Sequence, residues 1–274
     1  MISILSRLFR MRLVLVNGSA ALGGYLLFPG EPNFSVLLAL FIGVSFLAAA
    51  GSALNQVLER QSDSVMQRTK ERPLPNGDLS ALAATFIGTG CIAAGILILL
   101  AIGGTVPALF GAAALLWYLV VYTPLKRRTP FALALGALCG AAPPVIGWCV
   151  AGGSPADFRI ILLAGILYLW QVPHFWLLQR RHADDYRRAG FPLFTPRGNG
   201  AGPAPICLLW MVAMIAGAMM LPAFGIIEGG KAALWSVAFC APLLIIVFKR
   251  CEPALFACLN LFPVLITLAL CVSR

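Results

Sequence analysis

The chain has 274 residues, of which 60% are hydrophobic and only 11% are charged. A water-soluble domain carries about 25% charged residues, so this composition excludes an ordinary soluble protein and indicates a membrane protein. Lys and Arg outnumber Asp and Glu by 20 to 10, giving a formal net charge of +10 at pH 7. In a membrane protein the placement of such an excess indicates orientation, so we expect no nucleic-acid partner.

Apolar stretches follow one another along the whole chain, with Gly- and Pro-rich breaks between them. A membrane-spanning helix needs about 20 predominantly apolar residues, so each stretch is long enough for one crossing. The expected crossings lie near 13–28, 34–58, 81–101, 106–122, 131–150, 160–179, 204–221, 232–248 and 254–271. The first lacks a small-residue cleavage site, which indicates a retained helix. We therefore predict an all-α integral membrane protein with a single bundle of nine transmembrane helices, forming one domain over residues 1–274.

Basic residues are distributed very unevenly over the connections between these stretches. Of the 20 Lys and Arg, 17 fall at the N-terminus or in connections that nine crossings place on one side of the membrane. Because cytoplasmic loops carry the excess of Lys and Arg, the amino terminus is expected in the cytoplasm and the carboxyl terminus outside. The long connections 59–80 and 180–203 on this basic side also hold most of the acidic residues. That combination indicates either a metal and anion site or solvated loop charges.

The strongest chemical signal is a ladder of oxygen-bearing side chains at the end of the second stretch. Asn55, Glu59 and Asp63 are four residues apart, a spacing that places them along one helix face about 6 Å from each other. Proteins hold Mg²⁺ through one or two carboxylates together with phosphate oxygens of the substrate. The ladder therefore predicts one or two Mg²⁺ ions that bind a diphosphate. Arg68 and Arg72 follow closely enough to neutralise the remaining phosphate charge.

The ladder belongs to one of three sequence blocks that resemble the UbiA superfamily of intramembrane prenyltransferases. The first block, at 55–75, is similar to the family's NxxxDxxxD element followed by a basic segment ending in RPL. The second runs from YTPLKRRTP at 122–130 to GAAPPVIGW at 140–148. The third runs from WQVPHFW at 170–176 to DDYRRAGFP at 184–192. The second and third blocks resemble the branch of the family that farnesylates protohaem IX.

This resemblance implies a nine-helix UbiA-like fold whose polar cavity faces the cytoplasm, in an Mg²⁺-dependent enzyme of a bacterial inner membrane. The implied reaction transfers the farnesyl group of farnesyl diphosphate to a vinyl group of protohaem IX. Addition of water then gives haem O, and diphosphate is released. The implied partners are farnesyl diphosphate, protohaem IX, the lipid bilayer, and haem-handling or oxidase-assembly membrane proteins.

The resemblance also implies roles for individual residues. The implied catalytic residues are Asn55, Glu59, Asp63 and His174, and the implied metal ligands are Asn55, Glu59, Asp63 and Asp184. The implied diphosphate- or propionate-binding residues are Arg68, Arg72, Tyr122, Lys126, Arg127, Asp185 and Tyr186. An imidazole at His174 could approach haem iron or move a proton, and a hydrogen-bonded helix-end histidine is the alternative.

Two positions depart from the family pattern. The first Asp of the ladder is Glu59, whose longer side chain can still coordinate Mg²⁺, and the usual Asn after the LKRRTP element is Ala132, which cannot hydrogen-bond. Two alternatives therefore stay open: prenyl transfer to another acceptor, such as a quinone precursor or a chlorophyll-type alcohol, and a non-catalytic scaffold. A transporter is disfavoured, because the carboxylates lie at helix ends on one side and no repeated halves are evident.

Overall fold

The computed structural model describes residues 2–193, 205–248 and 252–273, and every regular element in these ranges is helical. The elements are α1 (Ile2–Phe9), α2 (Met11–Leu27), α3 (Phe34–Val65), α4 (Ala81–Gly103), α5 (Thr105–Leu116), the π-helical η1 (Trp117–Tyr122), α6 (Thr123–Leu125), α7 (Ala132–Val150), α8 (Phe158–Arg181), α9 (Ala183–Arg188), α10 (Pro205–Ala223), α11 (Gly229–Trp235), the π-helical η2 (Ser236–Cys240), α12 (Ala241–Phe248) and α13 (Glu252–Ser273). Part of the basic connection 180–203 and the basic residues at 249–250 lie outside the described ranges.

Seven helices in the described ranges are long and apolar enough to cross a membrane. They are α3, α4, the continuous rod of α5, η1 and α6, and α7, α8, α10 and α13. Outer faces carry large exposed apolar side chains such as Phe86 and Phe248, as expected of surfaces that face lipid. The all-helical prediction is thus confirmed for these residues. The other two predicted crossings correspond to the 17-residue α2 and to α11, η2 and α12, and the count of nine stays a prediction.

Polar side chains at the helix starts explain where several of these helices begin. Asn33 accepts hydrogen bonds from the backbone N–H groups of Ser35 and Val36 at the start of α3. Ser80 and Asp157 cap α4 and α8 in the same way. These caps satisfy backbone donors that have no partner inside the helix.

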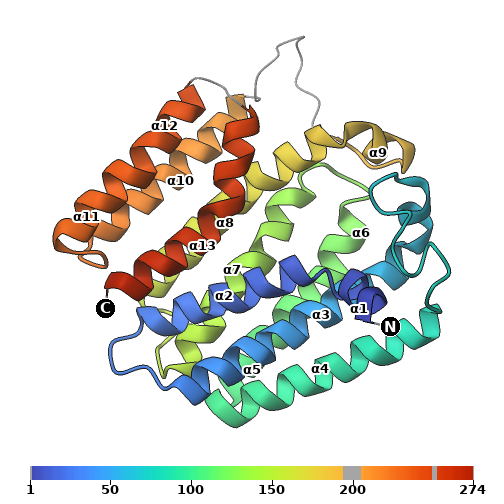
Figure 1. The fold of residues 1–274 in the computed structure, drawn as a ribbon, viewed down its shortest axis with the longest axis horizontal. Coiled ribbons are helices and arrows are strands. Elements are labelled where there is room, and N and C mark those ends of the chain that lie inside the picture. Colours follow the sequence, from blue (N-terminus) through green and yellow to red (C-terminus); the bar gives the residue numbers. More distant parts are fainter. Residues whose placement is uncertain (1, 194–204, 249–251, 274) are drawn as a thin grey trace.

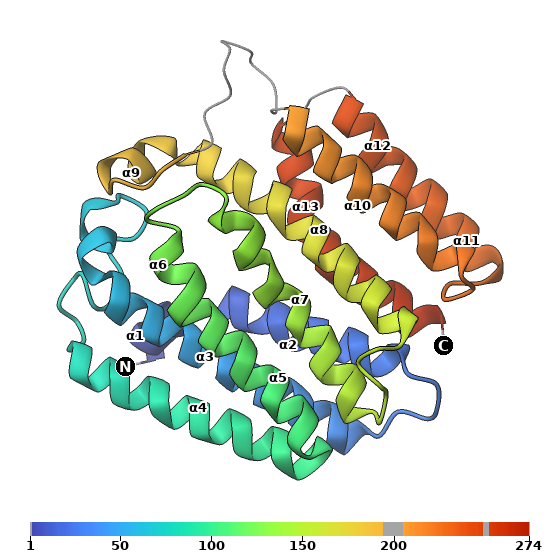
Figure 2. The same ribbon diagram turned by 180° about the vertical axis from the view of Figure 1, so that it is seen from behind.

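Two short helices were not expected, and one long helix exceeds its expected length. The helical conformation is interrupted at Arg10, so α1 is separate from α2. The other short helix, α9, lies within the predicted connection 180–203. The helix α3 continues beyond the apolar stretch to Val65, so the whole ladder is helical. Figures 1 and 2 show α1, α9 and the connection between α3 and α4 at the same end of the molecule.

Small residues allow the central helices to approach closely. A Cβ atom added to Gly24 of α2 would lie 1.8 Å from the backbone oxygen of Pro144, and one added to Gly147 of α7 would lie 1.9 Å from that of Ala21. The same occurs between α3 and α4, where a Cβ on Gly95 would lie 2.8 Å from the backbone oxygen of Gly43. Close backbone approach at small residues is typical of helix packing in membranes.

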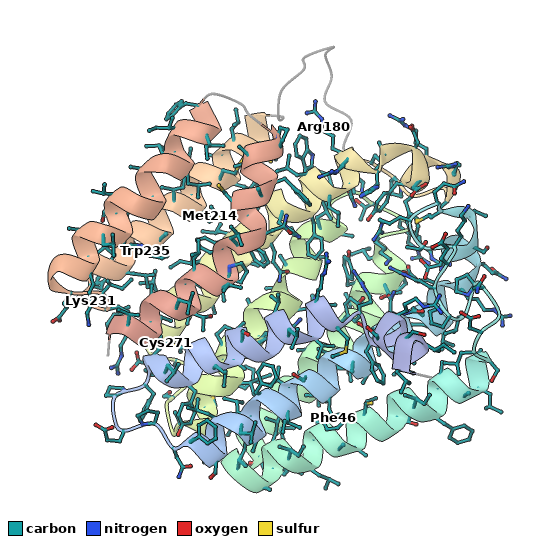
Figure 3. All side chains as sticks on the ribbon, in the orientation of Figure 1. Phe46, Arg180, Met214, Lys231, Trp235 and Cys271 are labelled. Atoms are coloured by element: carbon teal, nitrogen blue, oxygen red, sulfur yellow. The ribbon has the colours of Figure 1, made fainter. Side chains whose placement is uncertain are left out.

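The C-terminal helices form the largest apolar core against α8. Met211, Met214 and Phe262 are fully buried there, and the Trp170 indole donates a hydrogen bond to the backbone oxygen of Leu259 at 2.6 Å, which links α8 to α13. Figure 3 shows polar side-chain atoms concentrated at the end formed by α1, α9 and the α3–α4 connection, whereas Lys231 lies at the opposite end. The polar end is therefore where a charged ligand would be recognised.

Candidate active site

A cavity, lined by α2, α3, the α5–η1–α6 rod, α7 and α8, reaches the polar end of the bundle. Its wall on α3 consists of Val44, Leu47, Ala48, Gly51, Ser52, Asn55, Glu59 and Asp63. Spacings of three and four residues define one helix face, and at about 1.5 Å per residue this face extends for about 28 Å. Polarity falls along it, from carboxylates at the mouth through small residues to aliphatic ones. The cavity therefore suits an amphiphile with an anionic head and a hydrocarbon tail.

The structure brings most of the predicted site residues to this cavity. Eight of them line it: Asn55, Glu59, Asp63, Arg68, Arg72, Tyr122, Lys126 and Tyr186. They come from α3, its following connection, the α5–η1–α6 rod and α9, which are separated by up to about half of the chain. The predicted ladder and the predicted cations thus face one space.

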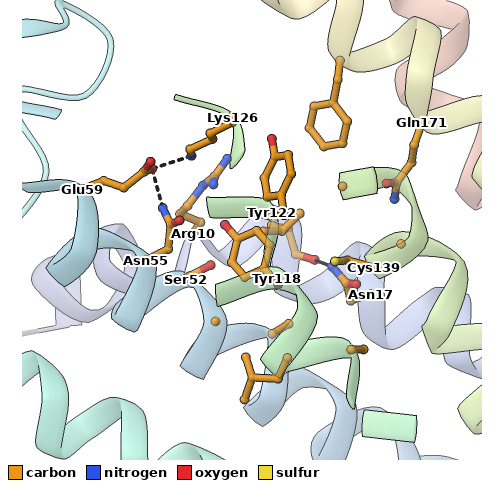
Figure 4. A pocket seen from close by; sticks show the side chains of 18 of the residues that line it. Arg10, Asn17, Ser52, Asn55, Glu59, Tyr118, Tyr122, Lys126, Cys139 and Gln171 are labelled. Atoms are coloured by element: carbon orange, nitrogen blue, oxygen red, sulfur yellow. Dashed lines mark hydrogen bonds and ion pairs between the residues drawn. The ribbon is translucent and has the colours of Figure 1, made fainter. Parts of the chain in front are cut away.

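Glu59 lies at the centre of a buried hydrogen-bonded set. Its Oε2 accepts hydrogen bonds from Nδ2 of Asn55 at 3.0 Å and from Nζ of Lys126 at 2.5 Å (Figure 4). The hydroxyl of Thr123 donates to Oδ1 of Asn55 at 3.0 Å, which orients the amide so that its nitrogen faces Glu59. Burial lowers the pKa of Lys126, although the charge of Glu59 opposes that effect. The other Glu59 oxygen, Oε1, is buried without a hydrogen-bond partner, which leaves it available to a cation.

Asp63 forms the second buried ion pair of the mouth. Its carboxylate accepts a hydrogen bond from Nη1 of Arg72 at 2.6 Å, and its backbone oxygen accepts one from the Thr69 hydroxyl at 2.9 Å. These contacts fold the connection after α3 back onto the end of that helix. Both carboxylates of the ladder are therefore neutralised by cations of the chain itself.

The residues of the ladder fit a metal ion that is shared with a phosphate group. Within the described ranges no group of three or more His, Cys, Asp and Glu side chains is arranged to enclose a metal. Mg²⁺ does not require such a cage, because it usually keeps waters and takes one or two carboxylates plus substrate phosphates. The unpaired Oε1 of Glu59 and the carboxylate of Asp63 offer that kind of ligand set.

Asp185 joins α9 to the connection that carries Arg68. Its two carboxylate oxygens accept hydrogen bonds from the backbone N–H groups of Gln67 and Arg68, both at 3.0 Å, and Arg188 pairs with it at 2.5 Å. Burial opposes ionisation of this carboxyl, but these donors outweigh it and hold the pKa of Asp185 below its usual value. Asp185 is not among the residues that line the cavity. The structure therefore places it as a clamp between two connections, away from the predicted ligand contact.

Asp184 and Arg127 also lie apart from the cavity lining. The Asp184 side chain is 86% exposed and pairs with Arg187 at 2.7 Å, so the structure does not bring it to the other predicted metal ligands. Arg127 is exposed, and its Nη2 donates a hydrogen bond to the backbone oxygen of Leu58 at 3.2 Å. The resemblance implied roles for both residues because they lie within the family motifs, but neighbouring side chains of one motif point in different directions.

His174 lies on the side of α8 that faces α13. Its ring stacks on Trp170, with centroids 5.1 Å apart, and on Phe256 of α13, with centroids 5.6 Å apart. Its Nδ1 atom is buried without a hydrogen-bond partner, and His174 is not a lining residue of the cavity. The structure thus surrounds the imidazole with aromatic rings and separates it from the ladder. Ala132, the other departure from the family pattern, is buried at the start of α7 and does not line the cavity.

Several polar lining residues were not predicted. Arg10, Asn17, Ser52, Gln171 and Gln179 all line the cavity. Most are isolated polar residues within apolar stretches, which is a signal that could have found them, because such residues usually face a protein interior or a water-filled space. Arg10 gave no such signal, because it stands in a basic N-terminal segment where the charge is explained by orientation alone.

Aromatic rings form part of the wall just inside the mouth. Tyr118 and Tyr122 of η1 stack with ring centroids 5.7 Å apart, and both line the cavity. The Lys126 ammonium lies 5.5 Å from the Tyr122 ring and 5.8 Å from the Phe191 ring. These rings present π faces near the position of the ladder, where a developing carbocation could be stabilised.

Comparisons with known proteins agree on the family. The model of the UbiA prenyltransferase family matches residues 17–270. A relative from Geobacter sulfurreducens named Protoheme IX farnesyltransferase is 58% identical over 263 residues, covering 96% of each chain. A relative of the same name from Nitratidesulfovibrio vulgaris is 37% identical over 223 residues, covering 81% of this chain and 77% of its own.

Solved structures share the fold at low sequence identity. A UbiA homolog from Aeropyrum pernix K1 has a TM-score of 0.72 and 19% identity, with 94% of this chain and 97% of that chain covered. A UbiA homolog from Archaeoglobus fulgidus, bound to DMAPP and Mg²⁺, has a TM-score of 0.66 and 15% identity, with 98% of each chain covered. These likenesses extend over the described bundle as a whole.

Proposed function

The chain belongs to the UbiA prenyltransferase family, and from that premise we propose that it transfers farnesyl from farnesyl diphosphate to a vinyl group of protohaem IX. The observation that carries this proposal is the extensive identity to a relative named Protoheme IX farnesyltransferase. The cavity supports it, because a charged mouth with an apolar inner wall matches a prenyl diphosphate. A single domain over the whole chain would contain both substrates.

In the proposed reaction the bond between the farnesyl C1 atom and the diphosphate oxygen breaks, and the electron pair leaves with diphosphate. The farnesyl carbon bonds to the terminal vinyl carbon of protohaem, which leaves a carbocation beside the porphyrin ring. Water adds there and loses a proton, giving the hydroxyethylfarnesyl group of haem O. The step that needs most stabilisation is charge separation during diphosphate departure.

Cationic side chains at the mouth would stabilise the departing diphosphate. Arg68, Arg72 and Lys126 all line the cavity near the ladder. Lys126 and Arg72 each use one donor on the carboxylates, and ammonium and guanidinium groups have further donors for phosphate oxygens. Fixed cations in a low-dielectric site favour the more charged transition state over the ground state. Bound Mg²⁺ would add Lewis-acid stabilisation of the same leaving group.

The allylic end of the farnesyl group would lie against Tyr118 and Tyr122. Their stacked rings line the cavity between the ladder and the aliphatic inner wall. A cation over a tyrosine face gains about 0.5 to 2 kcal/mol. The isoprenoid tail would then extend along the α3 face towards the aliphatic side chains of Leu47 and Val44.

We further propose that the chain crosses the membrane nine times, with the amino terminus and the cavity mouth in the cytoplasm. The mouth collects the cations Arg10, Arg68, Arg72 and Lys126, and cytoplasmic surfaces carry such an excess. Haem-handling or oxidase-assembly proteins in the same membrane would supply protohaem and take up the product.

The test is incubation of membranes containing the chain with protohaem, farnesyl diphosphate and Mg²⁺, followed by mass analysis of the extracted pigment. The expected product exceeds protohaem by the mass of one farnesyl group and one hydroxyl group. Parallel incubations replace protohaem with a quinone precursor, or replace Mg²⁺ with a metal chelator. Product formed only with the quinone precursor would replace the proposed acceptor, and full activity with chelator would remove the metal from the proposal.

A further inference from the structure

Arg10 adopts a backbone conformation that residues with side chains rarely adopt. It stands between α1 and α2 with φ 56° and ψ 62°, and among the described residues it is the one non-glycine residue with positive φ. This left-handed conformation brings the Cβ atom close to the following carbonyl oxygen, so it persists only where the surrounding structure enforces it. Contacts of the neighbouring residues must therefore offset the strain at Arg10.

Contacts of α1 enforce this turn. The buried Nε2 of Gln56 on α3 donates hydrogen bonds to the backbone oxygens of Leu8 at 2.8 Å and Arg7 at 3.2 Å. The Arg7 guanidinium donates to the backbone oxygen of Glu71 and to Asp78, both at 2.9 Å. The end of α1 is therefore tied to α3 and to the α3–α4 connection. The chain must turn at Arg10 to enter α2, and the turn directs the side chain into the cavity (Figure 4).

Arg10 also differs from the paired cations of the mouth in its partners. Lys126 and Arg72 neutralise Glu59 and Asp63, whereas no hydrogen bond or ion pair joins the Arg10 guanidinium to another described residue. Burial and the nearby charge of Arg72 lower the pKa of Arg10. Arg10 is half-buried at the cavity wall, and a cation held there without a counter-charge favours the entry of an anion.

We propose that Arg10, held by the turn that Gln56 anchors, binds anionic oxygens of the ligand directly and without a divalent metal. The inference rests on the proposed function, since the anions that would reach this position are the diphosphate of the prenyl donor and the propionates of protohaem. A phosphate group and a carboxylate each present two oxygens that a guanidinium can bind with two parallel hydrogen bonds.

The test measures binding to the purified chain in the presence of a metal chelator. Calorimetry with inorganic pyrophosphate measures the affinity for a diphosphate. Absorbance titrations with protohaem and with its dimethyl ester measure the contribution of the propionates to haem affinity. Arg10→Gly should lower the affinity for pyrophosphate or for protohaem by about tenfold or more, since each charge-assisted hydrogen bond contributes on that order. Arg10→Lys keeps the charge but lacks the two parallel N–H donors of a guanidinium, so it should recover part of the affinity. If Arg10→Gly binds both pyrophosphate and protohaem with wild-type affinity, the proposal is overturned.

Two controls separate this outcome from unfolding and from a wrong function. Glycine adopts positive φ without strain, so Arg10→Gly should keep the wild-type helical circular dichroism and thermal midpoint. Arg12→Gln alters the adjacent exposed arginine and should keep both affinities within about twofold. Failure of the proposed function would appear as a wild-type chain that forms no farnesylated haem, whereas failure of the Arg10 role appears only in the binding measurements.

Discussion

At the scale of single residues, each carboxylate of the ladder is balanced by a cation of the chain. Glu59 and Asp63 are 4% and 3% exposed, and burying two carboxylates so close together would be costly without partners. Lys126 and Arg72 supply those partners in the ligand-free protein. A charged ligand that enters the cavity therefore meets carboxylates that are already balanced by these cations. The cavity therefore depends on matched charges, and removal of one member affects the others.

Asp63→Asn tests the acidic end of this arrangement. The amide cannot balance Arg72, which Asp63 contacts at 2.6 Å, and cannot bind a divalent ion as strongly. We expect the rate of farnesyl transfer to fall by about a hundredfold or more. Turnover measured in membranes checks this, with helical circular dichroism as the control for folding. A variant with wild-type turnover would contradict the proposed metal role.

Glu59 permits a paired comparison of charge and length. Glu59→Asp keeps the charge and restores the family's residue, so we expect activity within a few-fold of wild type. Glu59→Gln removes the counter-charge of Lys126, which lies 2.5 Å away, and should reduce kcat by about a hundredfold. Steady-state kinetics on both variants are the measurement. Complete loss in Glu59→Asp would mean that the longer side chain belongs to a rebuilt site.

At the scale of elements, short helices outside the predicted crossings build the mouth. The helix α9 is joined to the α3–α4 connection through Asp185, and α1 is joined to the same connection through the Arg7 guanidinium. The connection that carries Arg68 and Arg72 is thereby held from both sides. Contacts of α1 and α9 therefore fix where Arg68 and Arg72 lie, and we expect mutations in these short helices to weaken ligand binding by displacing those cations.

The adjacent pair Asp185 and Asp184 provides a matched test of the clamp. Asp185→Asn loses charge-assisted hydrogen bonds to the backbone N–H groups of Gln67 and Arg68. We expect faster hydrogen exchange at these amides and a KM for farnesyl diphosphate raised by about tenfold. Asp184→Asn, at an 86% exposed position, should leave both unchanged. An equal effect of the two substitutions would contradict the clamp.

The pKa of Asp185 also predicts how the clamp responds to pH. Because the folded-state pKa lies below the unfolded value of about 3.9, the clamp stabilises the fold above about pH 4 and this contribution is lost as pH falls through the lowered folded value. Protection of the Gln67 and Arg68 amides should therefore persist from neutral pH to about pH 4. Hydrogen exchange across this range is the measurement, and loss of protection near pH 6 would contradict it.

At the scale of the whole molecule, the close packing of α2 against α7 fixes the distance between two helices that line the cavity. The backbones meet at Gly24 and Gly147, where a Cβ atom would lie within 2 Å of a carbonyl oxygen of the opposite helix. Leu13 and Asn17 on α2 and Pro143 and Ile146 on α7 line the cavity. A change in the distance between these helices would therefore alter the cavity wall as well as the stability.

Gly24→Ala should destabilise the protein by about 1 to 3 kcal/mol, because the methyl group would collide with backbone rather than with a side chain that can move. Gly90→Ala on α4 is the matched control, since a Cβ there meets nothing within 4 Å, and alanine favours the helix by up to about 1 kcal/mol. Thermal unfolding in detergent micelles compares the two. A Gly24→Ala protein as stable as Gly90→Ala would show that the helices can separate without cost.

The sequence by itself determined the features that depend on local order. Stretches of about 20 apolar residues predict helices wherever they occur, and the helices near 34–58, 81–101 and 131–150 lie where expected. The four-residue spacing of Asn55, Glu59 and Asp63 requires only one helix to bring them to one face, and the structure has that helix in α3. Family motifs supplied the cations that meet the ladder.

Only the tertiary structure decided which of the remaining charged and polar residues face the cavity. Arg10 enters it because Gln56, 46 positions along the chain, anchors the end of α1, while Asp185 is turned to a backbone more than a hundred residues away and His174 faces α13. Each outcome depends on the relative rotation and distance of helices. Those are set by side-chain packing between distant segments, and no periodicity within one segment contains that information.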